Sequence, residues 1–283
     1  MIGIRTIIIV GLGLIGGSLA AACRRAFPRT RIVGVSRNPS SLRKAKSKGW
    51  IHEGTTDLKK ALHSSSLVVL STPVDTLKNF LVRLDRLAPR GTVVTDAGSV
   101  KGFLVRWSDL RQWKRIQFVG AHPMAGSHLQ GIPAARPELF KGALTFVARG
   151  RKTSPAALRL VAHFWKKISG RVLVISPELH DRLTAEISHV PHLLAALLVA
   201  NVSPRALRVA ASGFLDSTRV AQGDPQLWAP ILLENHREVE KGLEKFEANL
   251  KRLKKILAKE NARVLRGFLQ RSRKRRIALE NRS

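Results

Sequence analysis

The sequence contains one cysteine, no tyrosine and few acidic residues among its 283 positions. The single cysteine, Cys23, excludes an internal disulfide and a zinc site made of cysteines, and it fits a reducing cytoplasm. No apolar run is both long enough and free enough of charge to span a bilayer. The first expected strand begins so close to Met1 that no signal peptide is expected. These absences predict a soluble, cytoplasmic protein.

The shortage of acidic residues leaves a large positive charge, because 50 Lys and Arg face only 19 Asp and Glu, for a net charge of +31. Such a charge favours polyanions such as nucleic acid, or a small substrate with several negative charges. Residues 241–283 hold 15 of the Lys and Arg residues but only four Asp and Glu. We interpret this segment as a solvated tail. A nucleic-acid-binding appendage is the alternative, although the last fifteen positions offer no aromatic side chain for stacking on bases.

The first half of the chain alternates short β-branched runs with helix-length segments, which predicts a mostly parallel sheet covered on both faces. After about Pro177 no further strand is expected. The fold class is therefore an α/β Rossmann dinucleotide-binding domain, residues 1–176, followed by an all-helical domain, residues 177–283. The expected strands are Thr6–Val10, Arg31–Ser36, Leu67–Ser71, Thr92–Thr95, Gln117–Val119, Thr145–Ala148 and Arg171–Ile175. The expected helices of the second half are Pro177–Val202, Pro204–Leu215, Pro225–Leu257 and Asn261–Leu279.

A stripe of apolar residues near heptad spacing lies in the helical half. Ordinary helix packing explains such a stripe, and a dimer seam is the sharper alternative. Its members are Leu243, Phe246, Leu250, Leu253 and Leu257.

Three glycines, Gly11, Gly13 and Gly16, follow the first expected strand and open an apolar helix. In this position the GxGxxG pattern predicts a dinucleotide site. The first glycine allows the tight turn, the second lets the backbone approach the pyrophosphate, and the third allows close packing of helix on strand. The other residues expected at the cofactor are Leu12, Leu14, Ile15, Thr72 and Pro73.

The end of the second strand suggests which dinucleotide binds. Domains that prefer NAD usually place an acid there for the ribose 2′-hydroxyl, whereas this chain has Ser36 and Arg37. A hydroxyl can donate to a 2′-phosphate and a guanidinium can pair with it. We therefore expect NADP to be preferred over NAD, with Arg37 as a plain surface arginine being the alternative.

Two loops at the ends of later strands carry groups that can handle a proton. Ser99 lies in the DAGSVK segment, and His122 lies in GAHPMAGS. Because ligands of open α/β sheets bind at the carboxyl ends of the strands, both loops should face the cofactor.

In the helical half, His189 and His192 lie one helical turn apart, which would also suit two zinc ligands. The HExxH pattern of zinc enzymes is not present, and we expect no metal.

Together these segments resemble the prephenate/arogenate dehydrogenase family of tyrosine biosynthesis. The resemblance rests on GLGLIGGS, DAGSVK, GAHPMAGS, SHVPH, SGFLDSTR and DPQLW, in this order, and covers nearly the whole chain. It implies a Rossmann domain and a helical dimerisation domain, a homodimer, and an oxidoreductase that acts on CH–CH donors with NADP or NAD. The reaction implied is oxidative decarboxylation of prephenate to 4-hydroxyphenylpyruvate, or of arogenate to tyrosine.

The resemblance also implies roles for individual residues. His122 would accept the proton of the substrate's ring hydroxyl, and Ser99 would orient His122 and touch the nicotinamide. A neutral imidazole with a pKa near 6.5 suits this proton transfer. His192 and Arg219 would hold the substrate, Arg219 through a carboxylate. His189 and Trp228 are further residues expected to contact the substrate.

Two positions depart from the family pattern. His128 stands where many relatives have an acid, and Leu215 stands where some have a lysine. Both departures leave the expected catalytic residues in place.

Two other readings of the sequence predict different features. A β-hydroxyacid dehydrogenase would carry GLGxMG and a later catalytic lysine, which this chain lacks, and a basic nucleic-acid-binding module would not need His122.

Overall fold

The computed structural model describes residues 4–62, 67–127 and 129–280. These residues form two compact units, one ending at His236 and the other beginning at Arg237. Each unit is described by itself below.

The first unit contains a sheet whose eight strands, within the described residues, follow the order β3-β2-β1-β4-β5-β6-β7-β8. All neighbouring strands are parallel except β6 and β7, which are antiparallel, with His122 opposite Phe146. The strands are β1 (Thr6–Val10), β2 (Arg31–Val35), β3 (Glu53–Thr55), β4 (Leu67–Leu70), β5 (Thr92–Asp96), β6 (Ile116–Pro123), β7 (Leu144–Ala148) and β8 (Arg171–Ile175).

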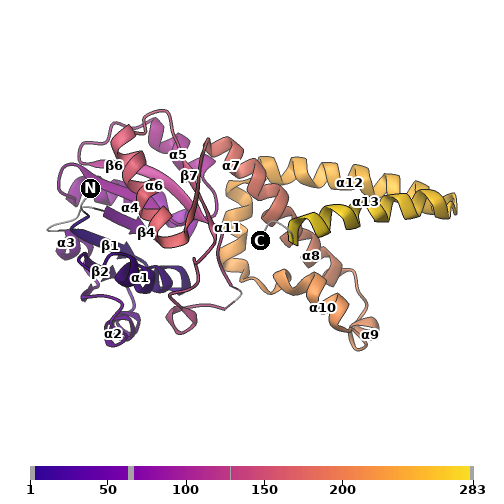
Figure 1. Ribbon diagram of the computed structural model, residues 1–283, viewed down its shortest axis with the longest axis horizontal. Coiled ribbons are helices and arrows are strands. Elements are labelled where there is room, and N and C mark those ends of the chain that lie inside the picture. Colours follow the sequence, from indigo (N-terminus) through magenta and orange to yellow (C-terminus); the bar gives the residue numbers. More distant parts are fainter. Residues whose placement is uncertain (1–3, 63–66, 128, 281–283) are drawn as a thin grey trace. The chain divides into compact units, whose positions relative to one another are not determined.

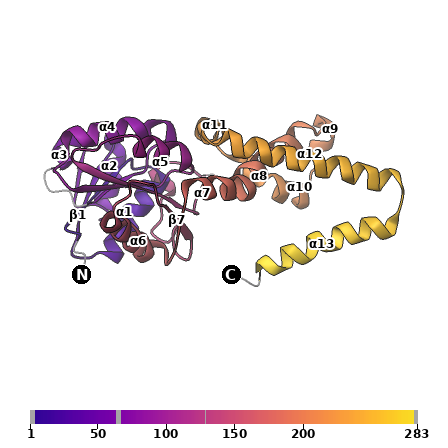
Figure 2. The ribbon, with the colours of Figure 1, turned by 90° about the horizontal axis from the view of Figure 1, so that it is seen from above.

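Helices cover both faces of this sheet, as the apolar runs predict (Figure 1). Figure 2 shows α1 and α6 on one side, and α3, α4 and α5 on the other. One apolar core lies under α1 and α6, and a second lies under α3, α4 and α5. The helices are α1 (Leu14–Ala26), α2 (Pro39–Ser47), α3 (Leu58–Ala61), α4 (Leu77–Leu87), α5 (Gly102–Asp109) and α6 (Pro155–Ser169), with short 3₁₀ turns at Val74–Thr76 and Ile132–Ala134.

Two details of the sheet differ from expectation. The short strand β3 was not expected, because Glu53–Thr55 is only three residues long and none of its residues is fully buried. Strand β6 is longer than the expected Gln117–Val119, because its end pairs with β7 from Gly120 to Pro123. This extension is what makes His122 part of a strand and not of a loop.

The helical half begins with one continuous helical stretch, Pro177–Ala200, made of α7 (Pro177–Thr184), a π-helical turn (Ala185–His189) and α8 (Val190–Ala200). By length and composition this stretch could cross a membrane, but a third of it is buried in the protein and a single such helix is weak evidence. Ser176 caps its start by accepting the Leu179 N–H.

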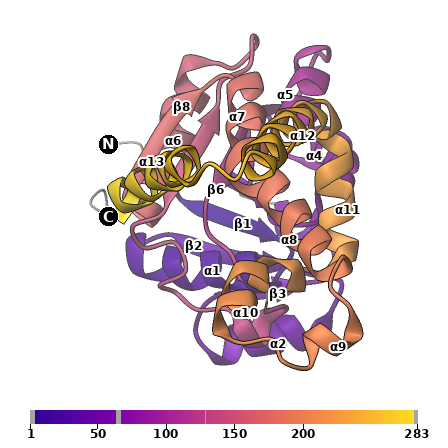
Figure 3. The same cartoon turned by 90° about the vertical axis from the view of Figure 1, so that its right-hand side faces the viewer.

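The remaining helices of the first unit are shorter than expected. The predicted helix Pro204–Leu215 is wrong in part, because it is two helices, α9 (Pro204–Leu207) and α10 (Ser212–Thr218). A 3₁₀ turn, Arg219–Gln222, and α11 (Pro225–Glu234) follow. Figure 3 shows α10 and α11 near α8, and the 3₁₀ turn and α10 also pack on α8.

The predicted helix Pro225–Leu257 is likewise interrupted, and α12 (His236–Ala258) begins after Asn235. Asn235 leaves the helical conformation, and its buried amide donates hydrogen bonds to other segments instead. Most of α12 belongs to the second unit, together with α13 (Ala262–Glu280). Within that unit the apolar stripe of α12 is largely exposed, with Phe246, Leu250 and Leu257 between 43% and 52% accessible.

Candidate active site

The glycine loop between β1 and α1 has the geometry of a dinucleotide cradle. Gly11 has a φ of +93°, which favours glycine. A Cβ on Gly16 would lie 1.8 Å from the Gly11 carbonyl oxygen, so only glycine allows this contact between helix and strand. These two glycines are therefore explained by the protein's own backbone.

Gly13 differs, since a Cβ there would meet no atom of the protein within 4 Å and its φ of −88° is open to any residue. The fold itself therefore gives no reason for glycine at this position, whereas a ligand approaching the backbone does. Gly13 also begins α1 without a side-chain cap, which leaves helix N–H groups free for an anion. The loop thus fits the pyrophosphate of a dinucleotide.

The other expected cofactor residues border this loop. Leu12 is buried in the core, so its backbone and not its side chain can face a ligand. Leu14 and Ile15 are the first residues of α1. Thr72 and Pro73 follow β4. The Thr72 hydroxyl accepts a hydrogen bond from the Thr76 hydroxyl. Ser36 and Arg37 lie just beyond β2, and Arg37 is exposed with no ion-pair partner among the described residues.

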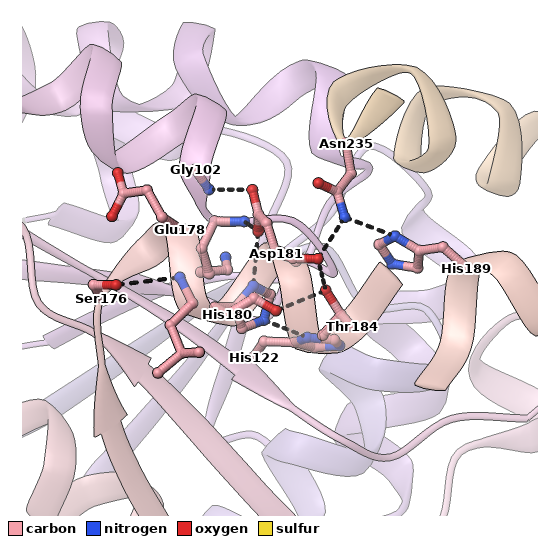
Figure 4. Close-up of polar contacts among 12 residues, drawn as sticks. Gly102, His122, Ser176, Glu178, His180, Asp181, Thr184, His189 and Asn235 are labelled. Atoms are coloured by element: carbon pink, nitrogen blue, oxygen red, sulfur yellow. Dashed lines mark hydrogen bonds and ion pairs between the residues drawn. The ribbon is translucent and has the colours of Figure 1, made fainter. Parts of the chain in front are cut away.

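His122 lies near the end of β6, and only 8% of it is exposed. Its Nδ1 is 2.9 Å from Nε2 of His180 on α7, and the two rings meet edge to face (Figure 4). Ser99 was expected to orient His122, but Ser99 Oγ has no hydrogen-bond partner in the described part of the chain. The neighbour that engages the ring is His180.

The carboxylate of Asp181 holds the start of α5. Its Oδ1 accepts the Lys101 N–H at 2.8 Å and also lies 2.8 Å from Nδ1 of His180. Its Oδ2 accepts the Gly102 N–H at 2.8 Å (Figure 4). One side chain of the helical half therefore binds both the segment that follows Ser99 and the histidine that contacts His122.

A buried ion pair lies beneath the same segment. The Lys101 ammonium donates to Asp96 Oδ2, and both side chains are fully buried. Asp96 also accepts the Gly98 N–H at 2.9 Å and the Ala121 N–H at 3.0 Å. Asp96 thereby joins the end of β5 to the strand that carries His122.

His189 lies on the π-helical turn and is 1% exposed. The Asn235 amide donates to the Asp181 carbonyl at 2.9 Å and lies 3.0 Å from Nδ1 of His189. Because the amide nitrogen is a donor, Nδ1 of His189 accepts, and the His189 proton is on Nε2.

Two expected substrate residues, His192 and Trp228, are stacked on each other. Their ring centroids are 3.7 Å apart and nearly parallel, and Trp228 also meets the His189 ring edge to face at 6.2 Å. Nδ1 of His192 is buried and has no partner among the described residues.

Arg219 begins the 3₁₀ turn that packs on α8, and it is exposed. Leu215 is exposed on α10, and His128 lies outside the described residues.

Burial shifts the protonation equilibria of these groups. It lowers the pKa of His122 well below 6.5, and His180, Lys101 and His189 lower it further. Burial likewise lowers the pKa of His180 to about 2 and that of His189 to about 4. The expected value near 6.5 for His122 is therefore too high, and the imidazoles are neutral at pH 7.

Burial acts in the opposite direction on the two carboxyl groups. It raises the pKa of Asp181 and of Asp96, while hydrogen bonds from backbone N–H groups and the nearby Lys101 charge work against the increase. His192 also has a lowered pKa, again through burial.

Five residues of this cluster were not predicted, namely Asp96, Lys101, His180, Asp181 and Asn235. The adjacent pair His180–Asp181, one turn after the capped start Ser176–Pro177, is the only local signal for two of them. Their contacts with the Rossmann half join residues 58 to 80 positions apart, which no local pattern reveals.

Comparison with known proteins gives two matching family models. Residues 19–174 match the nucleotide-binding domain of prephenate dehydrogenase, and residues 176–271 match the dimerization domain of prephenate dehydrogenase. The chain is 36% identical over 261 residues to the prephenate dehydrogenase of Bacillus subtilis (strain 168), covering 89% of this chain and 69% of the relative.

Solved structures give the same result. The prephenate dehydrogenase of Aquifex aeolicus in complex with hydroxyphenyl propionate and NAD+ superimposes with a TM-score of 0.91 at 34% identity, over 98% of this chain and 99% of that one. Synechocystis arogenate dehydrogenase gives a TM-score of 0.83 at 30% identity, over 97% and 100% of the two chains.

Proposed function

The chain belongs to the prephenate dehydrogenase family, and from this premise we propose that it oxidatively decarboxylates prephenate to 4-hydroxyphenylpyruvate in tyrosine biosynthesis. It is a dehydrogenase with a Rossmann-like nucleotide-binding domain followed by a helical dimerization domain. We place the division between these domains at residue 176, which differs from the division of the structure into compact units at His236.

The observation that carries the proposal is the state of His122. It is buried, neutral and fixed at the same sheet edge as the glycine loop. A neutral imidazole whose Nδ1–H donates within the protein has the lone pair of its Nε2 available to accept a proton. This is what oxidation of a ring alcohol requires at neutral pH.

The reaction assigns each group a task. A nicotinamide held at the glycine loop would supply the hydride acceptor for the ring carbon that bears the hydroxyl. His122 takes the hydroxyl proton, so that a carbonyl forms. The electrons of the bond to the ring carboxylate then flow through the ring to the carbonyl oxygen as carbon dioxide leaves, and the aromatic ring that forms takes one proton on this oxygen to become the phenol. Because aromatisation is strongly favourable, the protein has only to place the groups and remove one proton.

The helical half supplies recognition. Arg219 is exposed, without an ion-pair partner among the described residues, and can present its guanidinium to a substrate carboxylate. The buried Nδ1 of His192 without a partner supports a polar contact there, and Trp228 and His189 line the same region. We also propose that Ser99, which lies between β5 and α5, contacts the nicotinamide.

Arogenate is the second candidate substrate, because the chain is also similar to Synechocystis arogenate dehydrogenase. The two substrates differ only by an amine in place of the side-chain ketone. The family models and the Bacillus subtilis relative favour prephenate, which is therefore the leading substrate.

For the cofactor we propose NADP in preference to NAD. The support is the sequence after β2, where no acid stands, Ser36 is half-buried and Arg37 is exposed without an ion-pair partner among the described residues. The Aquifex aeolicus relative was solved with NAD+. The proposed preference for NADP therefore rests on Ser36 and Arg37 of this chain and not on that relative.

We further propose a homodimer formed through the helical domain, in the cytoplasm. The exposed apolar residues of α8, α10 and α12, among them Leu197, Leu198 and Leu215, support pairing with a second copy. The positive charge suits a dicarboxylate substrate, and we do not assign a nucleic acid as partner.

A two-by-two assay tests the proposal. Purified protein receives prephenate or arogenate with NAD or NADP, and the reduced cofactor is followed by absorbance. We expect the highest kcat/KM with prephenate and NADP. Arg37→Ala should raise the KM for NADP more than that for NAD, with the exposed Arg43→Ala on α2 as the matched control. No turnover with either substrate would refute the function, and a higher kcat/KM with NAD would refute the cofactor preference.

A further inference from the structure

The ring of His122 is linked through a second histidine to a carboxylate. His122 Nδ1 is 2.9 Å from His180 Nε2, and His180 Nδ1 is 2.8 Å from Asp181 Oδ1 (Figure 4). Asp181, His180 and His122 are thus joined in sequence by two hydrogen bonds, each of which contains one proton. The location of each proton decides what the far nitrogen of His122 can do.

The carboxylate sets the direction of this chain. Asp181 accepts backbone N–H groups on both oxygens, from Lys101 on Oδ1 and from Gly102 on Oδ2. These two donors and the nearby Lys101 charge favour the ionised carboxylate over the neutral acid, and an ionised carboxylate can only accept hydrogen bonds. The proton between Asp181 and His180 therefore belongs to Nδ1 of His180.

The rest follows from the chemistry of imidazole. A neutral His180 with its proton on Nδ1 has a lone pair on Nε2, which must accept from Nδ1–H of His122. His122 then carries its single proton on Nδ1, and its Nε2 bears the lone pair. This is the tautomer that can take a proton from a substrate hydroxyl.

The surroundings keep this arrangement in place. His180 is fully buried and meets the rings of His122 and Phe146 edge to face. The charged or titratable groups near it are Asp181, Lys101 and His189. Burial keeps the imidazoles neutral, so the chain acts through the position of a proton and not through an added charge.

We propose that His180 and Asp181 are positioning residues that hold His122 as the Nδ1–H tautomer, leaving its Nε2 free to accept the substrate proton. The proposal rests on the function proposed for His122. It assigns to the His180–Asp181 pair the orienting task that the sequence suggested for Ser99.

The first test reads the tautomers directly in the resting protein. Long-range ¹H–¹⁵N NMR of histidine-labelled protein distinguishes Nδ1–H from Nε2–H rings, and His122→Asn and His180→Gln assign the two signals. We expect both rings to carry their proton on Nδ1. A His122 ring protonated on Nε2 would overturn the proposal. Because no substrate is present, the result is independent of whether the enzyme turns over prephenate.

The second test compares two replacements of His180. In His180→Gln the side-chain oxygen can still accept from His122, whereas His180→Leu removes the acceptor at similar volume. We expect His180→Leu to lower kcat about 10- to 100-fold, which is part of the usual contribution of a general base, with KM for prephenate changed less than about threefold. His180→Gln should recover much of this loss.

Equal kcat values for the two variants would show a structural role only and would contradict the proposal. If His180→Leu does not fold, the tautomers of the wild-type protein decide the question. A protein with the expected tautomers but no activity towards prephenate or arogenate would refute the proposed function and leave the tautomer assignment standing.

Discussion

The two sides of the candidate site are built in opposite ways. On the sheet side, His122, Lys101 and Asp96 are buried and each is hydrogen-bonded or paired within the protein. On the side that we propose meets the ligands, Arg37 and Arg219 are exposed and have no ion-pair partner among the described residues. Burial fixes protonation and position, which suits chemistry, whereas exposed guanidinium groups are free to pair with an incoming anion. The contrast predicts that changes on the two sides affect different measured quantities.

The largest effect is expected from His122→Asn, which removes the proton acceptor. We expect kcat to fall by roughly 10²–10⁴-fold with little change in KM for prephenate. Steady-state kinetics measure both values, and His163→Asn, an exposed histidine on α6, is the matched control. Turnover like that of the wild type would remove His122 from the mechanism.

Breaking the buried ion pair should cost stability. Lys101→Met leaves the Asp96 carboxylate buried with only its two backbone donors. We expect the free energy of unfolding to fall by about 3–5 kcal/mol, as measured by urea denaturation. Lys251→Met, which breaks the exposed pair with Glu247, should cause no measurable loss. A Lys101→Met loss no larger than that of this control would contradict the contrast between the two sides.

The buried histidines should also make stability depend on pH. The pKa values of His122, His180 and His189 are lowered in the folded state, so the unfolded chain binds more protons and stability falls as pH drops below about 6.5. Between pH 7.5 and 5.5 His180 and His189, with folded pKa values of about 2 and about 4, each contribute about 1.4 kcal/mol, and His122 acts in the same direction. Asp96 and Asp181, with raised pKa values, oppose this trend as the pH falls further.

Urea denaturation at the two pH values measures this dependence, and His180→Gln should reduce it by about 1.4 kcal/mol. Equal stability at pH 7.5 and pH 5.5 would mean that these histidines are not held neutral by burial.

The smallest effect is expected on the exposed side. Arg219→Ala should raise the KM for prephenate about tenfold, which corresponds to about 1.4 kcal/mol of binding, with stability unchanged. Arg208→Ala, another exposed arginine after α9, is the control. If KM stays the same, Arg219 does not hold the substrate carboxylate.

Local signals in the sequence were sufficient for the features that depend on neighbouring residues. The buried runs of β1 and β4 and the glycine loop are of this kind. The long form of β6 was not predicted, because it depends on pairing with β7 more than 20 residues later. The interruption at Asn235 was missed for a similar reason, since the amide is held by Asp181 and His189.

The same distinction applies to the site. His122 and the glycines lie in motifs that can be read in one short segment. His180 and Asp181 act on residues 58 to 80 positions away, and their role is visible only once α7 is folded against β6 and α5.

The carboxylate of Asp181 has a consequence for how the two ligands affect each other. It ties the backbone after Ser99 to the helix that leads to His189 and His192. A cofactor that orders the segment around Ser99 therefore also restricts the start of that helix. If the cofactor and the substrate bind at these two segments, as proposed, we expect the binding of one to change the affinity for the other, and each to change the other's affinity by the same factor.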